Sequence, residues 1–114
     1  LIGLELSISV LSAALRGEPT GATRQWRGDV ASVAKRPLRA GEMLDGEGGY
    51  TVYGKLMPAA ASRAEGVLPI GLAHRVKLKR DIAAGGLVRM SDVELDETSL
   101  AVRTRRDLER LNDM

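Results

Sequence analysis

The residues best suited to chemistry gather in one short, glycine-rich segment, residues 45–55. Two acids, two tyrosines and a lysine stand among its glycines: Asp45, Glu47, Tyr50, Tyr53 and Lys55. One interpretation is a loop that contacts a ligand, with Lys55 as a point charge beside a substrate or cofactor phosphate. The other is a glycine-rich turn that the fold requires, with both tyrosine hydroxyls hydrogen-bonded. The pattern favours the turn.

Acid–base or metal chemistry would need further groups close to this segment. Asp45 and Glu47 could act as paired carboxylates or bind a divalent cation, but no third ligand is apparent. His74, the only histidine, could act as a general base because an imidazole titrates near neutrality. No acid partner for it is identifiable, so a structural histidine is favoured. His74 therefore joins the possible ligand-contacting residues, and no residue is assigned as catalytic, cofactor-binding or metal-binding.

The composition excludes several kinds of site and partner. The 114 residues include no cysteine and one histidine, which excludes disulfides and thiolate metal sites and disfavours a zinc site. A net charge of +2 and 3% aromatic residues do not favour nucleic-acid binding. The apolar run from Leu1 to Leu15 is too short and too interrupted to span a membrane, and it makes a poor signal peptide. We expect a cytoplasmic protein with no nucleic-acid or membrane partner.

The elements that must position these residues are short. An apolar stripe predicts a helix within residues 1–17 that Gly17 ends, its members being Leu4, Ile8, Leu11 and Leu15. Residues 18–28 are expected to form a linker that Trp26 anchors to the domain. Strands are predicted at 30–34, 50–53, 76–79, 87–88 and 93–95, with residues 59–66 as one helical turn or a loop.

A second helix is predicted in the C-terminal segment, residues 98–114. Its apolar or small side chains recur at helical spacing, at Leu100, Thr104, Leu108 and Leu111. Three arginines on the same helix could bind a phosphate or an acidic partner, but a solvated face is favoured: Arg103, Arg105 and Arg106.

A repeat at an offset of 44 residues is the most informative feature of the chain. The segment Lys35–Gly41, KRPLRAG, matches Lys79–Gly85, KRDIAAG, and an aliphatic pair follows each copy two residues later. In each copy an aliphatic side chain, Leu38 or Ile82, is expected to fill the core beneath a turn whose glycine adopts a positive φ. Two such elements predict a pseudo-twofold arrangement about one core.

The first copy, KRPLRAGEMLDGEG, resembles the opening of SAF domains, which share the compact β-clip fold with an internal dyad. Longer stretches, among them GDVASVAKR and LPIGLAHRVKLKRDIAAG, resemble the C-terminal region of homoserine dehydrogenase-like oxidoreductases. That group includes enzymes similar in activity to 1-deoxy-D-xylulose 5-phosphate reductoisomerase. The resemblance implies a mainly β, SAF-like domain over residues 29–97, flanked by an N-terminal and a C-terminal helix.

The same resemblance implies upstream Rossmann and catalytic domains that use NAD(P), with residues 1–17 belonging to that upstream region. No Gly-x-Gly-x-x-Gly follows a strand in this chain, so no cofactor is assigned to these residues. We therefore expect a fragment of a larger enzyme: a C-terminal accessory domain, not catalytic alone, that caps the catalytic region or mediates subunit contacts. Two alternatives stay open, a stand-alone module that binds a sugar acid or sugar phosphate, and a structural element that forms homo-oligomers.

Overall fold

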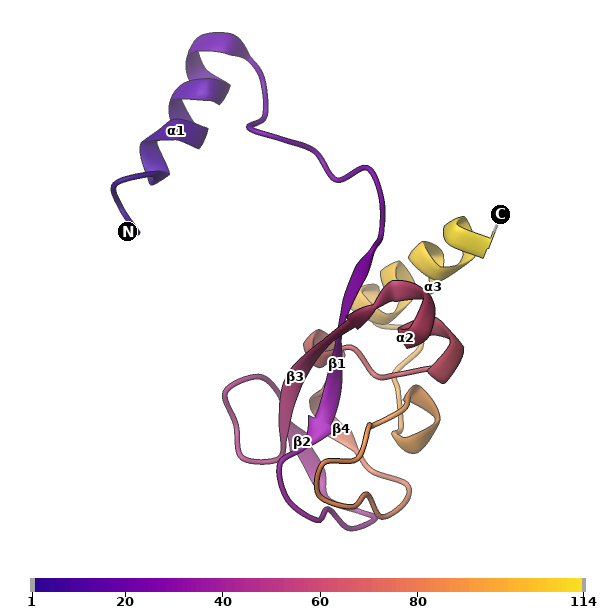
Figure 1. Cartoon of the computed structure of the whole chain (residues 1–114). Coiled ribbons are helices and arrows are strands. Elements are labelled where there is room, and N and C mark those ends of the chain that lie inside the picture. Colours follow the sequence, from indigo (N-terminus) through magenta and orange to yellow (C-terminus); the bar gives the residue numbers. More distant parts are fainter. Residues whose placement is uncertain (1, 114) are drawn as a thin grey trace.

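The computed structural model describes residues 2–113, which form helices and short strands in similar measure. The helices are α1 (Leu6–Leu11), α2 (Ala59–Glu65) and α3 (Leu100–Asp113), and the strands are β1 (Gly28–Ala34), β2 (Met43–Asp45), β3 (Val52–Pro58) and β4 (His74–Lys77). β1 pairs with β3 and β2 with β4, which gives two antiparallel two-stranded sheets (Figure 1). The described chain is therefore mixed α/β, and the expectation of a mainly β fold is not confirmed.

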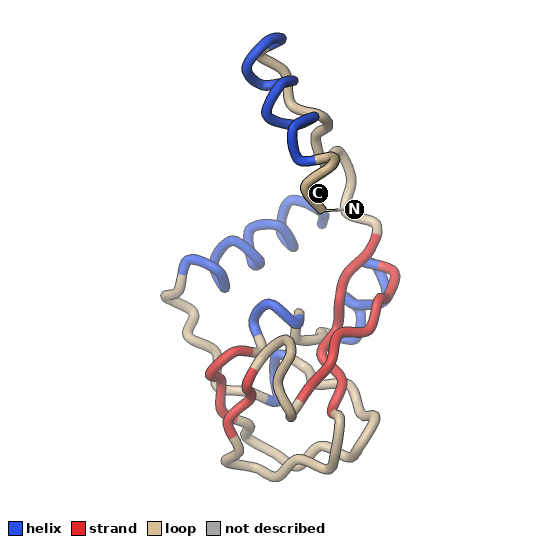
Figure 2. The backbone as a smooth tube through the Cα atoms, turned by 90° about the vertical axis from the view of Figure 1, so that its left-hand side faces the viewer, coloured by secondary structure: helices blue, strands red, loops and turns tan. Residues whose placement is uncertain are grey.

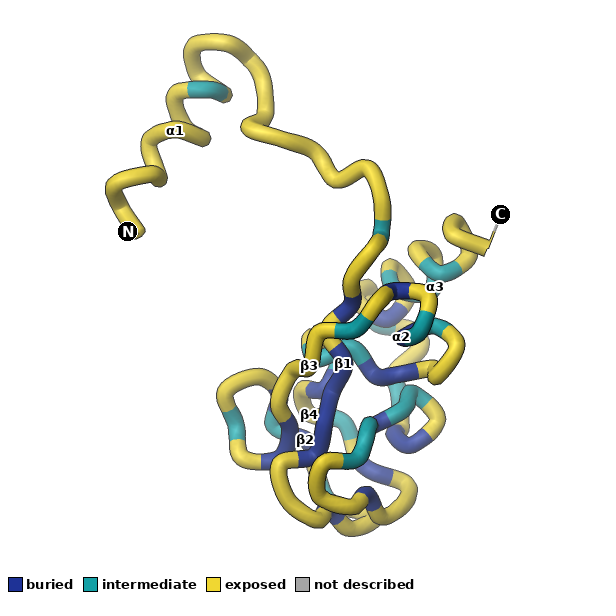
Figure 3. The backbone as a smooth tube through the Cα atoms, viewed as in Figure 1, coloured by how far each residue is buried: buried dark blue, intermediate teal, exposed yellow. Residues whose placement is uncertain are grey.

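The N-terminal helix lies apart from the rest of the chain in both views of the backbone (Figures 1 and 2). A π-helical turn, Ser12–Arg16, continues α1, and Gly17 then adopts a left-handed conformation with φ of 64°. Its amide donates to the Ala13 carbonyl at 3.1 Å, which closes the last turn. Gly17 thus ends the helix as the sequence predicts, and an exposed connection leads from it to β1 (Figure 3).

The longer sheet is a regular ribbon in which Gly28 lies opposite Pro58 and Ala34 opposite Val52. Ala31, Val33 and Ala34 turn buried side chains toward the body of the domain. The second strand of this ribbon begins at Val52, two residues after the predicted start at residue 50, because the preceding residues close a turn described below. α2 follows the ribbon directly, so the segment predicted as a helical turn or a loop is a helix over Ala59–Glu65 with Gly66 as its left-handed cap.

The two copies of the repeat meet each other at the centre of the domain. The Leu38 amide donates to the Ile82 carbonyl at 2.8 Å, and the Ile82 amide returns a bond of 2.9 Å to the Leu38 carbonyl. These two residues occupy the same place in the repeat, since their numbers differ by 44. Gly41 and Gly85, also 44 apart, have φ of 90° and 76°, as the shared turn predicts.

Bonds on either side of this central pair are related in the same way. The Gly41 amide donates to the Leu78 carbonyl at 2.8 Å, and the Gly85 amide donates to the Ala34 carbonyl, also at 2.8 Å. Leu78 and Ala34 are again 44 residues apart. An approximate twofold axis between Leu38 and Ile82 therefore relates the hydrogen bonds of one repeat copy to those of the other.

The core lies around this pair and is built from aliphatic side chains, including Leu38, Leu44, Leu68, Leu78 and Val88, each at most 1% exposed. Two of the predicted strands, at 87–88 and 93–95, contribute only single bridges, Leu87 to Val33 and Val93 to Leu78.

The C-terminal helix forms as predicted, but its leucine stripe does not face the core. Leu100 and Leu111 are 77% and 66% exposed, whereas Val102 is buried. The side that faces the body also carries Arg105, whose side chain is only 9% exposed. The face of α3 that packs on the domain is therefore the one that carries Arg105 and its polar contact, and not the one on which the leucines recur.

Candidate functional site

The predicted glycine-rich loop is a turn held closed by its own first residue. The Asp45 carboxylate accepts hydrogen bonds from the Tyr50 amide at 2.7 Å and the Thr51 amide at 3.1 Å. The Thr51 hydroxyl also donates to this carboxylate, and it accepts a bond from the Asp45 amide at 3.1 Å. Because Thr51 and Tyr50 donate to its charged form, the pKa of Asp45 falls to about 2. This carboxylate is therefore ionised and occupied at neutral pH, which makes it a poor proton donor or acceptor for catalysis.

Substituting Gly49 with alanine should open this turn and destabilise the domain. A Cβ at Gly49 would overlap the Asp45 carboxylate, so either the backbone shifts or the hydrogen bonds of that carboxylate break. We expect the free energy of unfolding to fall by about 1–3 kcal/mol, the usual cost of such overpacking. Urea denaturation followed by circular dichroism measures it. Gly71→Ala is the matched control, because nothing lies within 4 Å of a Cβ there; equal stability of the two variants would contradict the closed turn.

The other residues of the predicted site do not converge on a common point. Tyr50 and Tyr53 are 85% and 44% exposed, and their hydroxyls make no hydrogen bond within residues 2–113, contrary to expectation. Lys55 is exposed in mid-strand, opposite Ala31. The side chains of Tyr50, Tyr53 and Lys55 are therefore not grouped around a common point where a phosphate could bind.

His74 is the exception, because it lies beside the turn. It pairs with Asp45 across the β2–β4 sheet, and its Nδ1 would lie 2.8 Å from a Cβ at Gly46, so a glycine is required there. Glu47 is exposed in the same turn. No carboxylate of the described residues forms an ion pair with His74, since the Asp45 carboxylate is bound within its own turn. The arrangement lacks the acid partner that a histidine general base uses.

A buried ion pair was missed by the sequence analysis and joins four parts of the fold. Arg105 of α3 donates two parallel hydrogen bonds to Asp29 of β1, at 3.0 and 2.7 Å, and the two side chains are 9% and 8% exposed. Ser62 of α2 donates to the same carboxylate. The guanidinium carbon of Arg105 also lies 4.6 Å from the centre of the Trp26 ring, so the linker is anchored as expected for this tryptophan.

The charges in this cluster stabilise each other. Burial alone would raise the pKa of Asp29, but hydrogen bonds from Arg105 and Ser62 outweigh it and hold that pKa below its ordinary value. Glu109, one helical turn further on, accepts a bond of 2.8 Å from Nε of Arg105. The interpretation of Arg105 as part of a solvated face was therefore wrong. Two sequence signals point to the cluster: an aspartate in a strand that has no other charged residue, and the i, i+4 spacing of arginine and glutamate.

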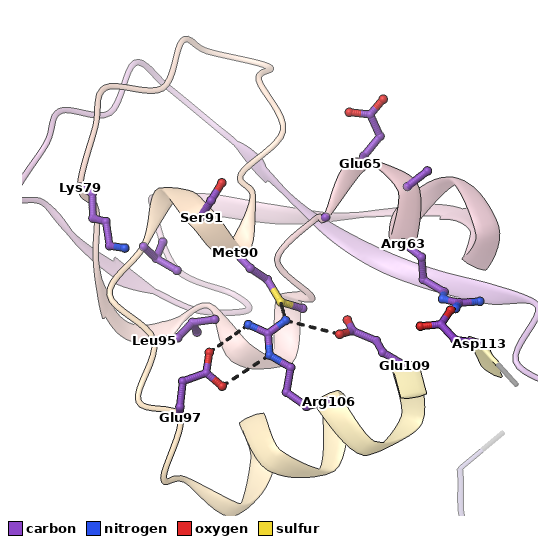
Figure 4. A pocket seen from close by; sticks show the side chains of 13 residues that line it. Arg63, Glu65, Lys79, Met90, Ser91, Leu95, Glu97, Arg106, Glu109 and Asp113 are labelled. Carbon is purple, nitrogen blue, oxygen red and sulfur yellow. Dashed lines mark hydrogen bonds and ion pairs between the residues drawn. The ribbon is translucent and has the colours of Figure 1, made fainter. Parts of the chain in front are cut away.

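A groove of about 880 Å³ lies between α3, α2 and the 3-10 turn at Met90–Asp92. Figure 4 shows Arg106 at its centre, pointing between Glu97 and Glu109 with Met90 beside it. Arg106 bonds Glu97 at 2.9 Å and Glu109 at 3.4 Å, and its guanidinium lies 3.1 Å from the Met90 sulfur. Arg106 therefore occupies the groove, and its guanidinium is already bound by side chains of the same chain.

The remaining charges of the groove are also paired, with one exception. Arg63 pairs with Asp113, and Glu65 pairs at 2.6 Å with Arg89. Lys79 alone among the charged lining residues has no ion-pair partner in the described part of the chain. The groove thus stabilises the packing of α3 and offers a ligand one uncommitted charge. It contains no cysteine or histidine, and its one serine, Ser91, has no histidine beside it to serve as a base.

Neither the turn nor the groove assembles groups that catalysis requires. Within residues 2–113, no three histidine, aspartate or glutamate side chains are placed to hold a metal ion. None of the helices in that range has the length and hydrophobicity needed to cross a membrane.

The most unusual exposed surface is apolar and lies at the other end of the chain. α1 and the residues around it carry seven large apolar side chains that are at least half exposed: Ile2, Leu4, Leu6, Ile8, Val10, Leu11 and Leu15. None of the residues of α1 or of the π-helical turn is buried. We refer to residues 2–16 as the N-terminal arm. Its surface is suited to contact with another protein surface.

The chain matches none of the known protein-family models, and no curated protein matches it.

Proposed function

We propose that this chain is an accessory domain of a larger NAD(P)-dependent oxidoreductase resembling homoserine dehydrogenase. In this proposal residues 29–97 are a SAF-like β-clip, and the domain contributes protein contacts rather than reacting groups. It caps the catalytic region or joins subunits, and the cofactor belongs to the upstream Rossmann domain. The resemblance of the sequence motifs supports the family, and the reciprocal bonding of the two repeat copies supports the β-clip.

One observation carries the role in protein contact: the exposed apolar surface of the N-terminal arm. Leu4, Ile8, Leu11 and Leu15 are 52% to 78% exposed, and neither α1 nor the π-helical turn after it contains a buried residue. Leaving large aliphatic side chains in water costs on the order of 1.5–3 kcal/mol each relative to burial. Burial of these side chains against a partner surface would stabilise the arm, which projects away from the domain core.

Binding of a sugar acid or sugar phosphate is the less favoured alternative. It depended on the 45–55 loop, whose main carboxylate is already bound by Tyr50 and Thr51. Lys55, the intended phosphate contact, lies away along β3. No feature of the described surface favours this alternative over protein contact.

The accessory role predicts that the 114-residue chain neither oxidises NADH or NADPH nor binds them. Absorbance at the nicotinamide band measures activity, with aspartate semialdehyde or 1-deoxy-D-xylulose 5-phosphate offered beside the reduced coenzyme and homoserine beside the oxidised coenzyme. Fluorescence of Trp26, the single tryptophan, measures binding. No turnover and no saturable change in fluorescence are expected. Turnover by the chain alone would contradict the proposal.

A further inference from the structure

One edge of the longer sheet is covered by the chain and the other is open. On the covered side of β1, the Ser32 amide donates to the Leu68 carbonyl at 2.9 Å and the Ala34 amide donates to the Gly86 carbonyl at 3.0 Å. β3, in contrast, has β1 as its only neighbouring strand in the described part of the chain (Figure 1). Its residues 53–56 are all exposed. The side of β3 that lies away from β1 is therefore a free sheet edge, which we call the outer edge of β3.

The register of the sheet identifies the backbone groups along this edge. In an antiparallel pair, successive residues turn their N–H and C=O groups alternately toward the partner strand and away from it. The Lys35 amide donates to the Thr51 carbonyl at 2.9 Å, so Tyr53 and Lys55 also bond to β1 and the residues beside them point outward. The outward residues are Val52, Gly54 and Leu56. No described residue hydrogen-bonds to their outward groups, and unpaired groups of this kind accept another strand.

The shorter sheet has irregular edges, whereas the outer edge of β3 is regular. β2 and β4 pair over few residues, and their register shifts between Met43 and Asp45. Arg75 of β4 has a φ of 56°, which departs from strand geometry. Such irregularities, and prolines, keep strand edges from pairing with another chain. β3 keeps one register from Val52 to Pro58, and its only proline is the last residue. It is therefore a continuous template for one more strand.

The outer edge of β3 is complementary to itself in one register. When Gly54 of two antiparallel copies lie opposite each other, Val52 of each copy lies opposite Leu56 of the other, and all the outward groups are bonded. Lys55 then lies opposite Tyr53 of the second copy. A shift that centres the pair on Lys55 would place two like charges opposite each other, which is destabilising. A shift that centres it on Tyr53 leaves Leu56 opposite a residue outside β3.

Side chains on both faces of the strand favour the register centred on Gly54. Lys55 has no ion pair and the Tyr53 hydroxyl has no hydrogen bond within residues 2–113. Opposite each other, the lysine can lie against the tyrosine ring, which is a favourable contact. On the other face Leu56, which is 76% exposed in the single chain, lies beside Val52 of the second copy and loses contact with water.

We propose that the outer edge of β3 binds the same edge of a second copy of this chain, so that the two β1–β3 pairs form one continuous antiparallel sheet. The contact is isologous, because the same bonds form twice about a twofold axis. It does not involve the N-terminal arm, so it adds a second contact surface to the proposed accessory role. An edge this short buries less than the roughly 1,200–2,000 Å² of a standard interface, so the dimer is weak and depends on concentration.

Hydrogen exchange of the 114-residue chain, resolved by NMR at low and high concentration, tests the pairing. The outward amides of Val52, Gly54 and Leu56 should exchange roughly tenfold or more slowly where most of the chain is dimeric. The amides of Tyr53 and Lys55 bond to β1 and should be protected at both concentrations. Sedimentation equilibrium should show the mass rising toward twice that of the monomer over the same range. A strict monomer, or outward amides that exchange equally fast at both concentrations, overturns the inference.

Leu56→Pro tests the hydrogen bonds of the outer edge. It removes an N–H that points away from β1, so the bonds between β1 and β3 remain. This variant should stay monomeric at concentrations where the wild type dimerises. Leu56→Val is the matched control, because it keeps the outward N–H and an apolar side chain, and it should still dimerise. Dimerisation of a folded Leu56→Pro variant as tight as that of Leu56→Val contradicts the proposed contact.

Tyr53→Glu tests the register and leaves the backbone unchanged. The new carboxylate lies opposite Lys55 of the second copy, and the same ion pair forms twice. The dimer should therefore be roughly threefold or more tighter than that of Tyr53→Gln, the control of similar size without the charge. In a pair centred on Tyr53 the two carboxylates would repel each other instead. A Tyr53→Glu dimer no tighter than the Tyr53→Gln dimer overturns the proposed pairing.

The results separate this inference from the proposed function. A monomeric chain overturns the pairing of β3 and leaves the accessory role intact, with the N-terminal arm as its contact surface. A chain that dimerises through β3 but oxidises NADPH alone contradicts the accessory role instead.

Discussion

Leu38→Ala is expected to lower the free energy of unfolding by about 3 kcal/mol, among the largest effects of any single substitution in this chain. Leu38 is 1% exposed and lies against Ile82 where the two copies of the repeat meet. Removing its side chain deletes buried methyl groups and leaves a cavity that both copies border. Since the backbone is fixed there by two reciprocal hydrogen bonds, the site has little freedom to collapse.

Urea denaturation followed by far-UV circular dichroism measures the effect of Leu38→Ala. Leu56→Ala is the matched control, because Leu56 has the same side chain, stands on β3 and is 76% exposed. The control should change stability by less than about 0.5 kcal/mol. A loss of stability no larger for Leu38→Ala than for Leu56→Ala would show that the two repeat copies do not pack as described.

Asp29→Ala is expected to destabilise the domain by about 3 kcal/mol, because it leaves the guanidinium of Arg105 without its buried counter-charge. The same change removes the acceptor of the Ser62 hydroxyl. Loss of these contacts should release α3 from β1, since Arg105 is the main polar link between them. Asp107→Ala is the control: Asp107 pairs with Arg110 on the outer side of α3, where both side chains are more than half exposed. That control should cost less than about 1 kcal/mol.

The contribution of Asp29 should also depend on pH. Its pKa is lower in the folded protein than in the unfolded chain, so the folded state favours the ionised form. The contribution is therefore fully present above the unfolded value of about 4 and is lost as pH falls through the lower folded value. The difference in stability between the wild type and Asp29→Ala, measured by urea denaturation, should shrink below about pH 4. A difference that stays constant as the pH falls from 6 to 3 would contradict the ion pair.

The local features of the fold were predictable because they depend on residues close in sequence. The repeat placed Gly41 and Gly85 at equivalent turns, and both have positive φ. Gly17 marked the end of the N-terminal helix, again by its left-handed conformation. The β3 strand was placed too early because the amides of Tyr50 and Thr51 donate to the Asp45 carboxylate instead of to a neighbouring strand.

Other features, which depend on distant residues outside the repeat, were not predictable. Asp29 and Arg105 are 76 residues apart, and their ion pair turns the leucines of α3 outward against the helical periodicity. The prediction of the candidate site failed for the same reason. Asp45 and His74 were both candidate residues, but no acid partner for His74 was identified from the sequence, whereas the fold pairs the two residues across a sheet. Spacing alone gave no sign that the carboxylate would be bound within its own turn.

Peptide mass spectrometry of the native protein, isolated through an antibody against residues 29–113, tests the accessory role most directly. The proposal predicts peptides that place a strand, a Gly-x-Gly-x-x-Gly segment and a helix in the same polypeptide, upstream of the N-terminal arm. It also predicts a mass well above that of this chain. A native product in which only a start methionine precedes Leu1 would contradict the proposal and leave a free-standing module.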